Sequence, residues 1–159
     1  MKQDKWKVYA FWIVIAEAVG ALAGFLTSQS ADIYAEMIEK PPLSPPGWVF
    51  PVVWVILYAL MGIAAARVML TEDTPQRDRA INLYIAQLIV NFFWPLFFFN
   101  LMAYGFSVVW LLILWVLVLL TILQFRKIDR VAAWLLLPYL VWLTFAAYLN
   151  IGVWRLNMV

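Results

Sequence analysis

Residues 106–125 read FSVVWLLILWVLVLLTILQF, an apolar run without a charged side chain. As an α-helix, this run is long enough to cross the roughly 30 Å hydrocarbon core of a bilayer. Further apolar runs of similar length lie at 8–26, 48–70, 80–101 and 131–153. Helices satisfy their own backbone hydrogen bonds, which lipid cannot do. The sequence therefore predicts an all-α integral membrane protein, a bundle of five transmembrane helices that forms a single domain over residues 1–159.

The composition supports this class and excludes several kinds of chemistry. Hydrophobic residues make up 67% of the 159-residue chain and charged residues 13%, whereas soluble domains are about a quarter charged. The chain has no cysteine and no histidine, which excludes disulfides, thiolate or imidazole metal sites and Ser-His-Asp triads. No metal site is therefore expected. The net charge is only +2, so no nucleic-acid partner is expected either.

The connection at 27–47 is expected to be the one long loop of the bundle, since the other connections are short. It ends in KPPLSPPGW at residues 40–48. Proline fixes φ and favours a stiff, extended path. The segment is therefore interpreted either as a lid or brace over one end of the bundle, or as a rigid connector without a role in binding.

Basic residues are distributed unevenly between the two ends of the predicted bundle. Nine of them belong to one end, namely Lys2, Lys5, Lys7, Arg67, Arg77, Arg79, Arg126, Lys127 and Arg130. Only Lys40 and Arg155 belong to the other end. Because cytoplasmic loops carry an excess of Lys and Arg, the bias predicts a cytoplasmic N-terminus in a plasma membrane and an external long loop.

Three of the runs carry aromatic and amide side chains at helical spacing. The three faces are Phe50, Trp54 and Tyr58; Gln87, Asn91 and Trp94; and Trp142, Ala146 and Asn150. Amides inside a membrane face the bundle interior, because lipid offers them no hydrogen bonds. The faces are expected either to line a pocket for a flat, mostly apolar ligand or simply to pack the helices together.

Two features of the first two runs are ambiguous from sequence. Glu17 is the one acid within a predicted span, and a structural or hydration role is favoured over a proton relay because no second buried acid is visible. Gly20 and Gly24 form a GxxxG pattern, and Gly62 and Ala66 form a related pattern of small residues. Both patterns permit close helix contacts, either within one bundle or between protomers.

Several separate motifs, in this order, resemble the tryptophan-rich sensory proteins of the TspO/MBR family, whose mitochondrial relatives are the translocator proteins or peripheral benzodiazepine receptors. The motifs are KPPLSPPGW at 40–48, WVILYALMG at 54–62, QLIVNFFWP at 87–95, PYLVWLTFA at 138–146 and LNIGVWR at 149–155. The resemblance extends over nearly the whole chain. It implies a five-helix bundle, commonly a homodimer, that binds porphyrins such as protoporphyrin IX or haem, and isoquinoline carboxamide-type ligands.

The resemblance also implies which residues bind the ligand. Positions that match the family pocket are Trp54, Asn91, Trp94, Trp142, Ala146 and Leu149, with Pro42 and Trp48 nearer the lid. The helical faces add Tyr58, Gln87 and Asn150 to the candidate ligand site. Lys40 and Arg155 are expected to hold the porphyrin propionates, because they are the two basic residues on the long-loop side. The porphyrin is a ligand here, and no obligatory cofactor is expected.

The leading functional interpretation is a membrane tetrapyrrole-binding sensor or regulator. One alternative is light-dependent oxidative degradation of protoporphyrin IX, with the candidate catalytic residues Trp54 and Trp142 as redox partners of the excited porphyrin. Another is porphyrin transport. The sterol-recognition pattern of the mitochondrial members is not intact, since Ile151 stands where they carry tyrosine. The chain is therefore expected in a bacterial plasma membrane, with the bacterial outer membrane as the other location.

Overall fold

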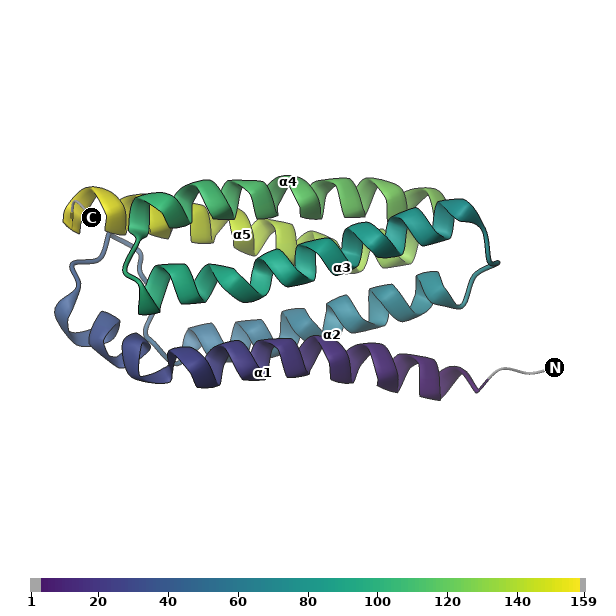
Figure 1. Cartoon of the computed structure of the whole chain (residues 1–159), viewed down its shortest axis with the longest axis horizontal. Coiled ribbons are helices and arrows are strands. Elements are labelled where there is room, and N and C mark those ends of the chain that lie inside the picture. The colour runs from purple at the N-terminus through teal and green to yellow at the C-terminus, as the bar shows by residue number, and fades with distance from the viewer. Residues whose placement is uncertain (1–3, 158–159) are drawn as a thin grey trace.

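The computed structural model describes residues 4–157, and these form a bundle of long helices along one axis (Figure 1). The helices are α1 (Lys5–Met37), α2 (Val49–Met69), α3 (Pro75–Pro95), α4 (Tyr104–Ile128) and α5 (Arg130–Asn157), with a π-helical turn η1 (Leu96–Asn100) that continues α3. Five helical segments are long and apolar enough to cross a membrane, α3 and η1 being one of them. The predicted all-α, five-helix fold is confirmed.

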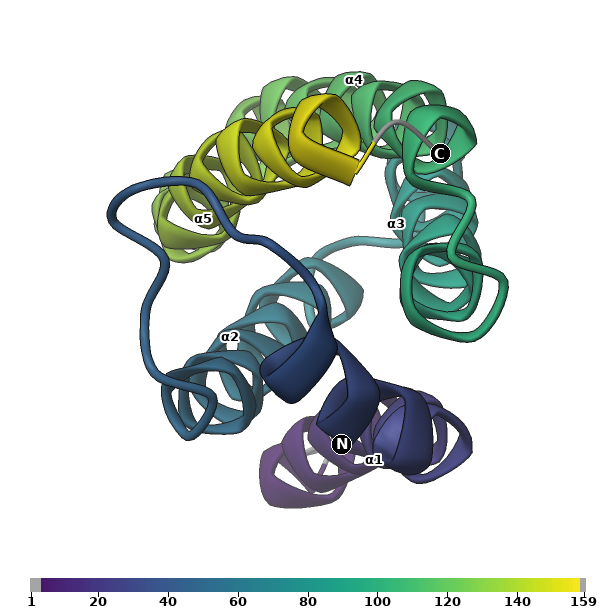
Figure 2. The same ribbon diagram turned by 90° about the vertical axis from the view of Figure 1, so that its left-hand side faces the viewer.

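The helices form a closed ring when the bundle is viewed along its axis (Figure 2). Around the ring the order of packed neighbours is α1, α2, α5, α4 and α3, and α3 with η1 returns to α1. The N-terminus and the α2–α3 and α4–α5 connections lie together at one end (Figure 1), here called the basic end. The α1–α2 and α3–α4 connections lie at the other, here called the loop end. The predicted grouping of the connections is therefore reproduced.

The predicted loop at 27–47 is wrong over its first half, because α1 continues to Met37. The polar residues there are compatible with a helix, since the Thr27 hydroxyl donates to the Ala23 carbonyl at 2.8 Å, one turn back. The helix ends where Ile38 turns extended, shortly before the prolines. Lys40 closes this end, because its ammonium donates to the carbonyl oxygens of Ala35 at 2.9 Å and Ile38 at 3.1 Å.

The remaining segment, residues 38–48, crosses the loop end beside α5 (Figure 2). Pro41 is buried and packs against Gly152, where any larger side chain would collide with the proline ring. The Tyr148 hydroxyl donates to the Pro42 carbonyl at 2.6 Å, and the Asn157 amide donates to the Glu39 carbonyl at 2.9 Å. The segment is thus held against α5, which is compatible with both interpretations of it from the sequence.

Small residues bring α1 and α2 together near the basic end. A Cβ atom added to Gly62 would overlap the backbone of Ile13, and one added to Gly20 would overlap the Tyr58 ring. A Cβ atom added to Gly24, one turn further along α1, would meet nothing within 4 Å. The contacts made by Gly20 and Gly62 are therefore inside one bundle, whereas Gly24 makes no such contact.

Candidate functional site

A cavity of about 900 Å³ opens inside the bundle on the loop-end side of Gly20 and Tyr58. This volume falls within the roughly 300–1,000 Å³ of small-molecule pockets. Every helix contributes to its wall. The lining includes Glu17, Gly20, Gly24, Thr27 and Tyr34 from α1, Lys40 and Pro45 from the segment 38–48, Phe50, Trp54 and Tyr58 from α2, Asn91, Trp94, Phe98 and Phe99 from α3 and η1, Leu111 and Leu114 from α4, and Trp142, Ala146, Leu149 and Asn150 from α5.

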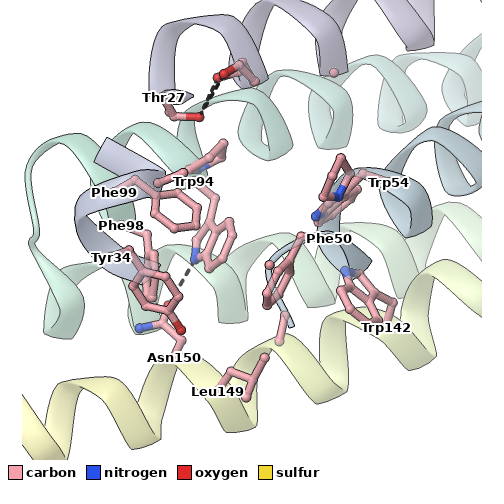
Figure 3. Close-up of a pocket in the computed structure, with 18 of the residues that line it drawn as sticks. Thr27, Tyr34, Phe50, Trp54, Trp94, Phe98, Phe99, Trp142, Leu149 and Asn150 are labelled. Atoms are coloured by element: carbon pink, nitrogen blue, oxygen red, sulfur yellow. Dashed lines mark hydrogen bonds between the residues drawn. The ribbon is translucent and has the colours of Figure 1, made fainter. Parts of the chain in front are cut away.

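One wall of the cavity is built from rings of α2 and α5 (Figure 3). The centroids of Trp54 and Trp142 lie 6.5 Å apart with their planes at 89°, and Phe50 meets Trp142 edge-on at 6.0 Å. The ring N–H of Trp142 is buried and has no acceptor among the described residues. Edge-to-face pairs of this kind hold each ring in a fixed orientation. The wall is therefore a preformed aromatic surface.

The opposite wall is held by a hydrogen bond that reaches across the bundle (Figure 3). The Trp94 ring nitrogen donates to the Asn150 side-chain oxygen at 3.0 Å, and the Asn150 amide donates to the Tyr104 carbonyl at 2.9 Å. Trp94 also stacks on Phe98 with 5.0 Å between centroids, and Phe98 packs against Tyr34 of α1. Trp94 and Asn150 thus fix α3, α4 and α5 to one another while they line the site.

A buried chain of hydrogen bonds closes the cavity toward the middle of the bundle. Tyr58 donates its hydroxyl proton to the Asn91 side-chain oxygen. The Asn91 amide donates to the Tyr139 hydroxyl at 2.6 Å, and Tyr139 donates to the Gln87 side-chain oxygen at 2.8 Å. Because Asn91 has both partners in place, it is held in one orientation and presents a polar group at the base of a mostly apolar cavity.

The structure brings most of the predicted site residues together. The nine that line the cavity are Lys40, Trp54, Tyr58, Asn91, Trp94, Trp142, Ala146, Leu149 and Asn150. The four that do not line it are Pro42, Trp48, Gln87 and Arg155. Gln87 is buried beneath the cavity as the end of the hydrogen-bond chain. Pro42, Trp48 and Arg155 are exposed on the outside of the loop end.

The two basic residues expected to hold propionates have different surroundings. Lys40 lines the cavity, but its ammonium already caps α1 and lies 5.1 Å from the centre of the Tyr34 ring. Two of its three N–H groups are used in these hydrogen bonds, so one remains for a ligand. Arg155 is exposed and lies outside the cavity wall.

Three parts of the site were missed by sequence reasoning. The cavity face of α1, including Gly20, Gly24 and Thr27, carried no aromatic or amide signal. Phe98 reaches the cavity through the wide π-helical turn η1, whose register a regular helix does not predict. Tyr139 was quoted within the motif at 138–146 but not as part of the site. Its position three residues before Trp142 and four before Leu143 puts it on the same inward face of the helix, and this spacing could have identified it.

The class of protein follows from this arrangement: it is a multi-pass integral membrane protein with an aromatic-walled cavity at one end of a five-helix bundle. Among the described residues, no cluster of three or more acidic side chains offers a metal site. The model of the TspO/MBR family matches residues 12–155. The chain belongs to this family.

Relatives from bacteria and animals match it over most of their length. It is 36% identical to the tryptophan-rich protein TspO of Chlorobaculum tepidum, over 93% of this chain and 94% of that protein. It is 35% identical to the tryptophan-rich sensory protein of Cereibacter sphaeroides, over 94% of this chain and 92% of that protein. The human translocator protein is 34% identical, over 94% of this chain and 90% of that protein.

Proposed function

We propose that the protein is a membrane tetrapyrrole-binding sensor or regulator, with protoporphyrin IX or haem in the cavity. The observation that carries the proposal is the preformed cavity of about 900 Å³, with Trp54 and Trp142 on one wall and Asn91 at its base. A planar macrocycle gains most from rigid aromatic faces, which lose little conformational entropy when the ligand binds. Membership of a family with members named sensory proteins supports the regulatory part.

The proposal is tested by titrating protoporphyrin IX into the purified protein in nanodiscs and following the quenching of tryptophan fluorescence. Binding in the micromolar range or tighter, lost in Ala146→Leu, would support it. Ala146 is nearly buried and lines the cavity, so a larger side chain there fills space that the macrocycle needs. Unchanged quenching in that variant would place the porphyrin elsewhere. The same titration with an isoquinoline carboxamide tests the second ligand class.

A second candidate function is the light-dependent oxidative degradation of protoporphyrin IX. Trp54 and Trp142 favour it, because their rings meet at 6.5 Å and both line the cavity. The excited porphyrin and oxygen would supply the chemistry, and the indoles would act as the nearby redox partners. Loss of the porphyrin absorption band under illumination, but not in the dark, would support this activity. Degradation that persists when Trp54 and Trp142 are both phenylalanine would show that the indoles play no part.

The location that we propose is a bacterial plasma membrane with the N-terminus in the cytoplasm. The basic end carries the excess of Lys and Arg, which marks the cytoplasmic side of plasma-membrane proteins. Because the chain has no cysteine, single cysteines report sidedness directly. Glu36→Cys at the loop end should react with an impermeant thiol reagent in intact cells. Glu72→Cys at the basic end should react only after lysis, and the opposite pattern would reverse the assignment.

A homodimer is the assembly that we propose from the family resemblance. The mass of the protein in nanodiscs or mild detergent, measured by light scattering after subtraction of lipid and detergent, tests it. A mass near 37 kDa, twice the 18.4 kDa of one chain, would support the dimer, whereas the mass of a single chain would contradict it.

A further inference from the structure

The cavity face of α1 is a row of small side chains with one acid at its deep end. Glu17, Gly20 and Gly24 line the cavity together, as expected from their spacing of three and four residues on one helix. Glu17 is the only charged residue between Lys7 and Asp32. A carboxyl group in the middle of an apolar transmembrane run is costly unless something compensates it.

Within the part of the chain that the structure describes, no basic side chain provides that compensation. Among residues 4–157, none lies within ion-pair distance of Glu17. Lys40 lines the same cavity, but it caps the far end of α1 through the Ala35 and Ile38 carbonyls. At 1.5 Å per residue, Ala35 lies roughly 27 Å from Glu17 along α1. Glu17 and Lys40 are therefore at opposite ends of the cavity, and Asp32, the other acid in its wall, is on α1 at the Lys40 end.

The hydroxyl of Tyr58, whose ring packs against this part of α1, already has a hydrogen-bond partner. Gly20, one turn from Glu17, packs against the ring of Tyr58. The Tyr58 hydroxyl donates its single proton to Asn91, so it has none left for the carboxylate. Glu17 itself lines the cavity, and the cavity face of α1 is open at Gly24, two turns further along the helix, where an added Cβ would meet nothing within 4 Å. A molecule in the cavity can therefore reach the Glu17 oxygens.

We propose that Glu17 forms a cation-accepting subsite of the cavity, for membrane-soluble ligands that join a flat apolar body to a protonated amine or amidinium. The body lies against the Trp54 and Trp142 wall, and the cationic group donates hydrogen bonds to the Glu17 carboxylate. Charge-assisted bonds of this kind are strong where water is largely excluded. The proposal rests on the proposed function only in using the same cavity.

A matched pair of probes tests the subsite. N,N-dimethyl-1-pyrenemethylamine is cationic near neutral pH, and 1-isobutylpyrene is its neutral isostere. Both are titrated against protein in nanodiscs of zwitterionic phosphatidylcholine, with binding to empty nanodiscs subtracted. We expect the wild-type protein to prefer the amine by about tenfold after this correction. In Glu17→Gln the preference should fall to about one. Glu36→Gln is the control, because Glu36 is exposed on α1 and does not line the cavity.

Equal affinity of the wild-type protein for the two probes would overturn the proposal. This comparison needs no variant, so the proposal can be tested even if Glu17→Gln does not fold. A preference for the amine that survives in Glu17→Gln would also overturn it. Protoporphyrin IX is titrated against the wild-type protein in parallel. If the amine binds through Glu17 and porphyrin does not bind, the cation subsite is supported and the proposed function is contradicted. If porphyrin binds and the wild-type protein does not prefer the amine, the proposed function is supported and the subsite is contradicted.

Discussion

The two halves of the bundle are built from the same helices but differ in how their side chains fill the space. Toward the basic end, Gly62 lets α1 and α2 touch, Ala64, Ala65 and Val68 are wholly buried, and Tyr84 stacks on Phe125. Toward the loop end, the neighbourhood of Gly24 is empty and a cavity of about 900 Å³ opens. The half toward the basic end is therefore closely packed, and the half toward the loop end contains the cavity.

The change between the halves follows from side-chain size on α1. Beyond Gly20 the inward positions of α1 are small, as at Gly24 and Ala31, while the helices across the ring carry Trp54 and Trp142. The rings of these two tryptophans contact one another, with 6.5 Å between their centroids. Phe98 and Phe99 pack against Tyr34 and keep α1 apart from α3. The cavity is therefore framed by packed aromatic contacts and is a built feature of the loop end.

The largest effect is expected from filling the close contact in the packed half. Gly62→Val should destabilise the protein by about 3 kcal/mol or more, because the new side chain must displace the Ile13 backbone. Gly24→Val is the matched control in the open half, where an added Cβ meets nothing within 4 Å. This variant should leave the midpoint temperature of thermal unfolding nearly unchanged. Thermal unfolding in detergent measures both. Similar losses in the two variants would contradict the difference drawn between the halves.

The next effect concerns binding in the open half. Trp142→Ala should weaken protoporphyrin affinity by about 2 kcal/mol, or roughly 30-fold, because it removes one of the two indoles of the aromatic wall. Trp142→Phe should cost less, since a ring remains. Trp134→Ala is the control on the same helix, because Trp134 is 68% exposed and lies outside the cavity. If Trp134→Ala weakens quenching-detected binding as much as Trp142→Ala, the porphyrin does not bind at the aromatic wall.

The packed half and the open half were not equally predictable from the sequence. The apolar runs predicted five helices because length and hydropathy alone decide which segments can span a bilayer. Spacing and family motifs located Trp54, Asn91 and Trp142, since amides and aromatic rings mark an inward face. The end of α1 was missed, because the apolar run ends at Leu26 although polar residues can continue a helix, as the hydroxyl of Thr27 does by bonding back to it.

Other parts of the site depend on tertiary geometry that local patterns do not encode. Arg155 is the last residue of the motif at 149–155, yet it lies on an exposed side of α5. Phe98 enters the cavity wall only because η1 changes the helical register. The sequence identifies Glu17 as an acid within a predicted span, but only the packing of α1 against the other helices places it in the cavity wall. Such features need the packed structure.

A smaller effect is expected where the two halves meet, in the buried hydrogen-bond chain. Tyr139→Phe should destabilise the protein by about 1.5 kcal/mol, because it leaves the Asn91 amide and the Gln87 oxygen without their shared partner. Tyr84→Phe is the matched control, since the Tyr84 hydroxyl is buried and makes no hydrogen bond within residues 4–157. Its removal should be neutral or stabilising. Equal losses in the two variants, measured by thermal unfolding, would show that the chain contributes nothing specific.

The smallest effect is expected at the surface of the basic end, where Arg67 and Asp129 form an ion pair with 2.8 Å between Nε and Oδ2. Their side chains are 35% and 17% exposed, so Asp129→Asn should cost only about 0.5 kcal/mol, and less at high salt. Asp129 also accepts the Val131 N–H at 3.0 Å in the first turn of α5. Asparagine can keep that bond but alanine cannot, so Asp129→Ala should cost about 1 kcal/mol. Because the additional loss in Asp129→Ala comes from a cap and not from charge, it should persist in high salt. If salt removes it as well, the cap contributes nothing, and the contacts between the α4–α5 turn and α2 are purely electrostatic.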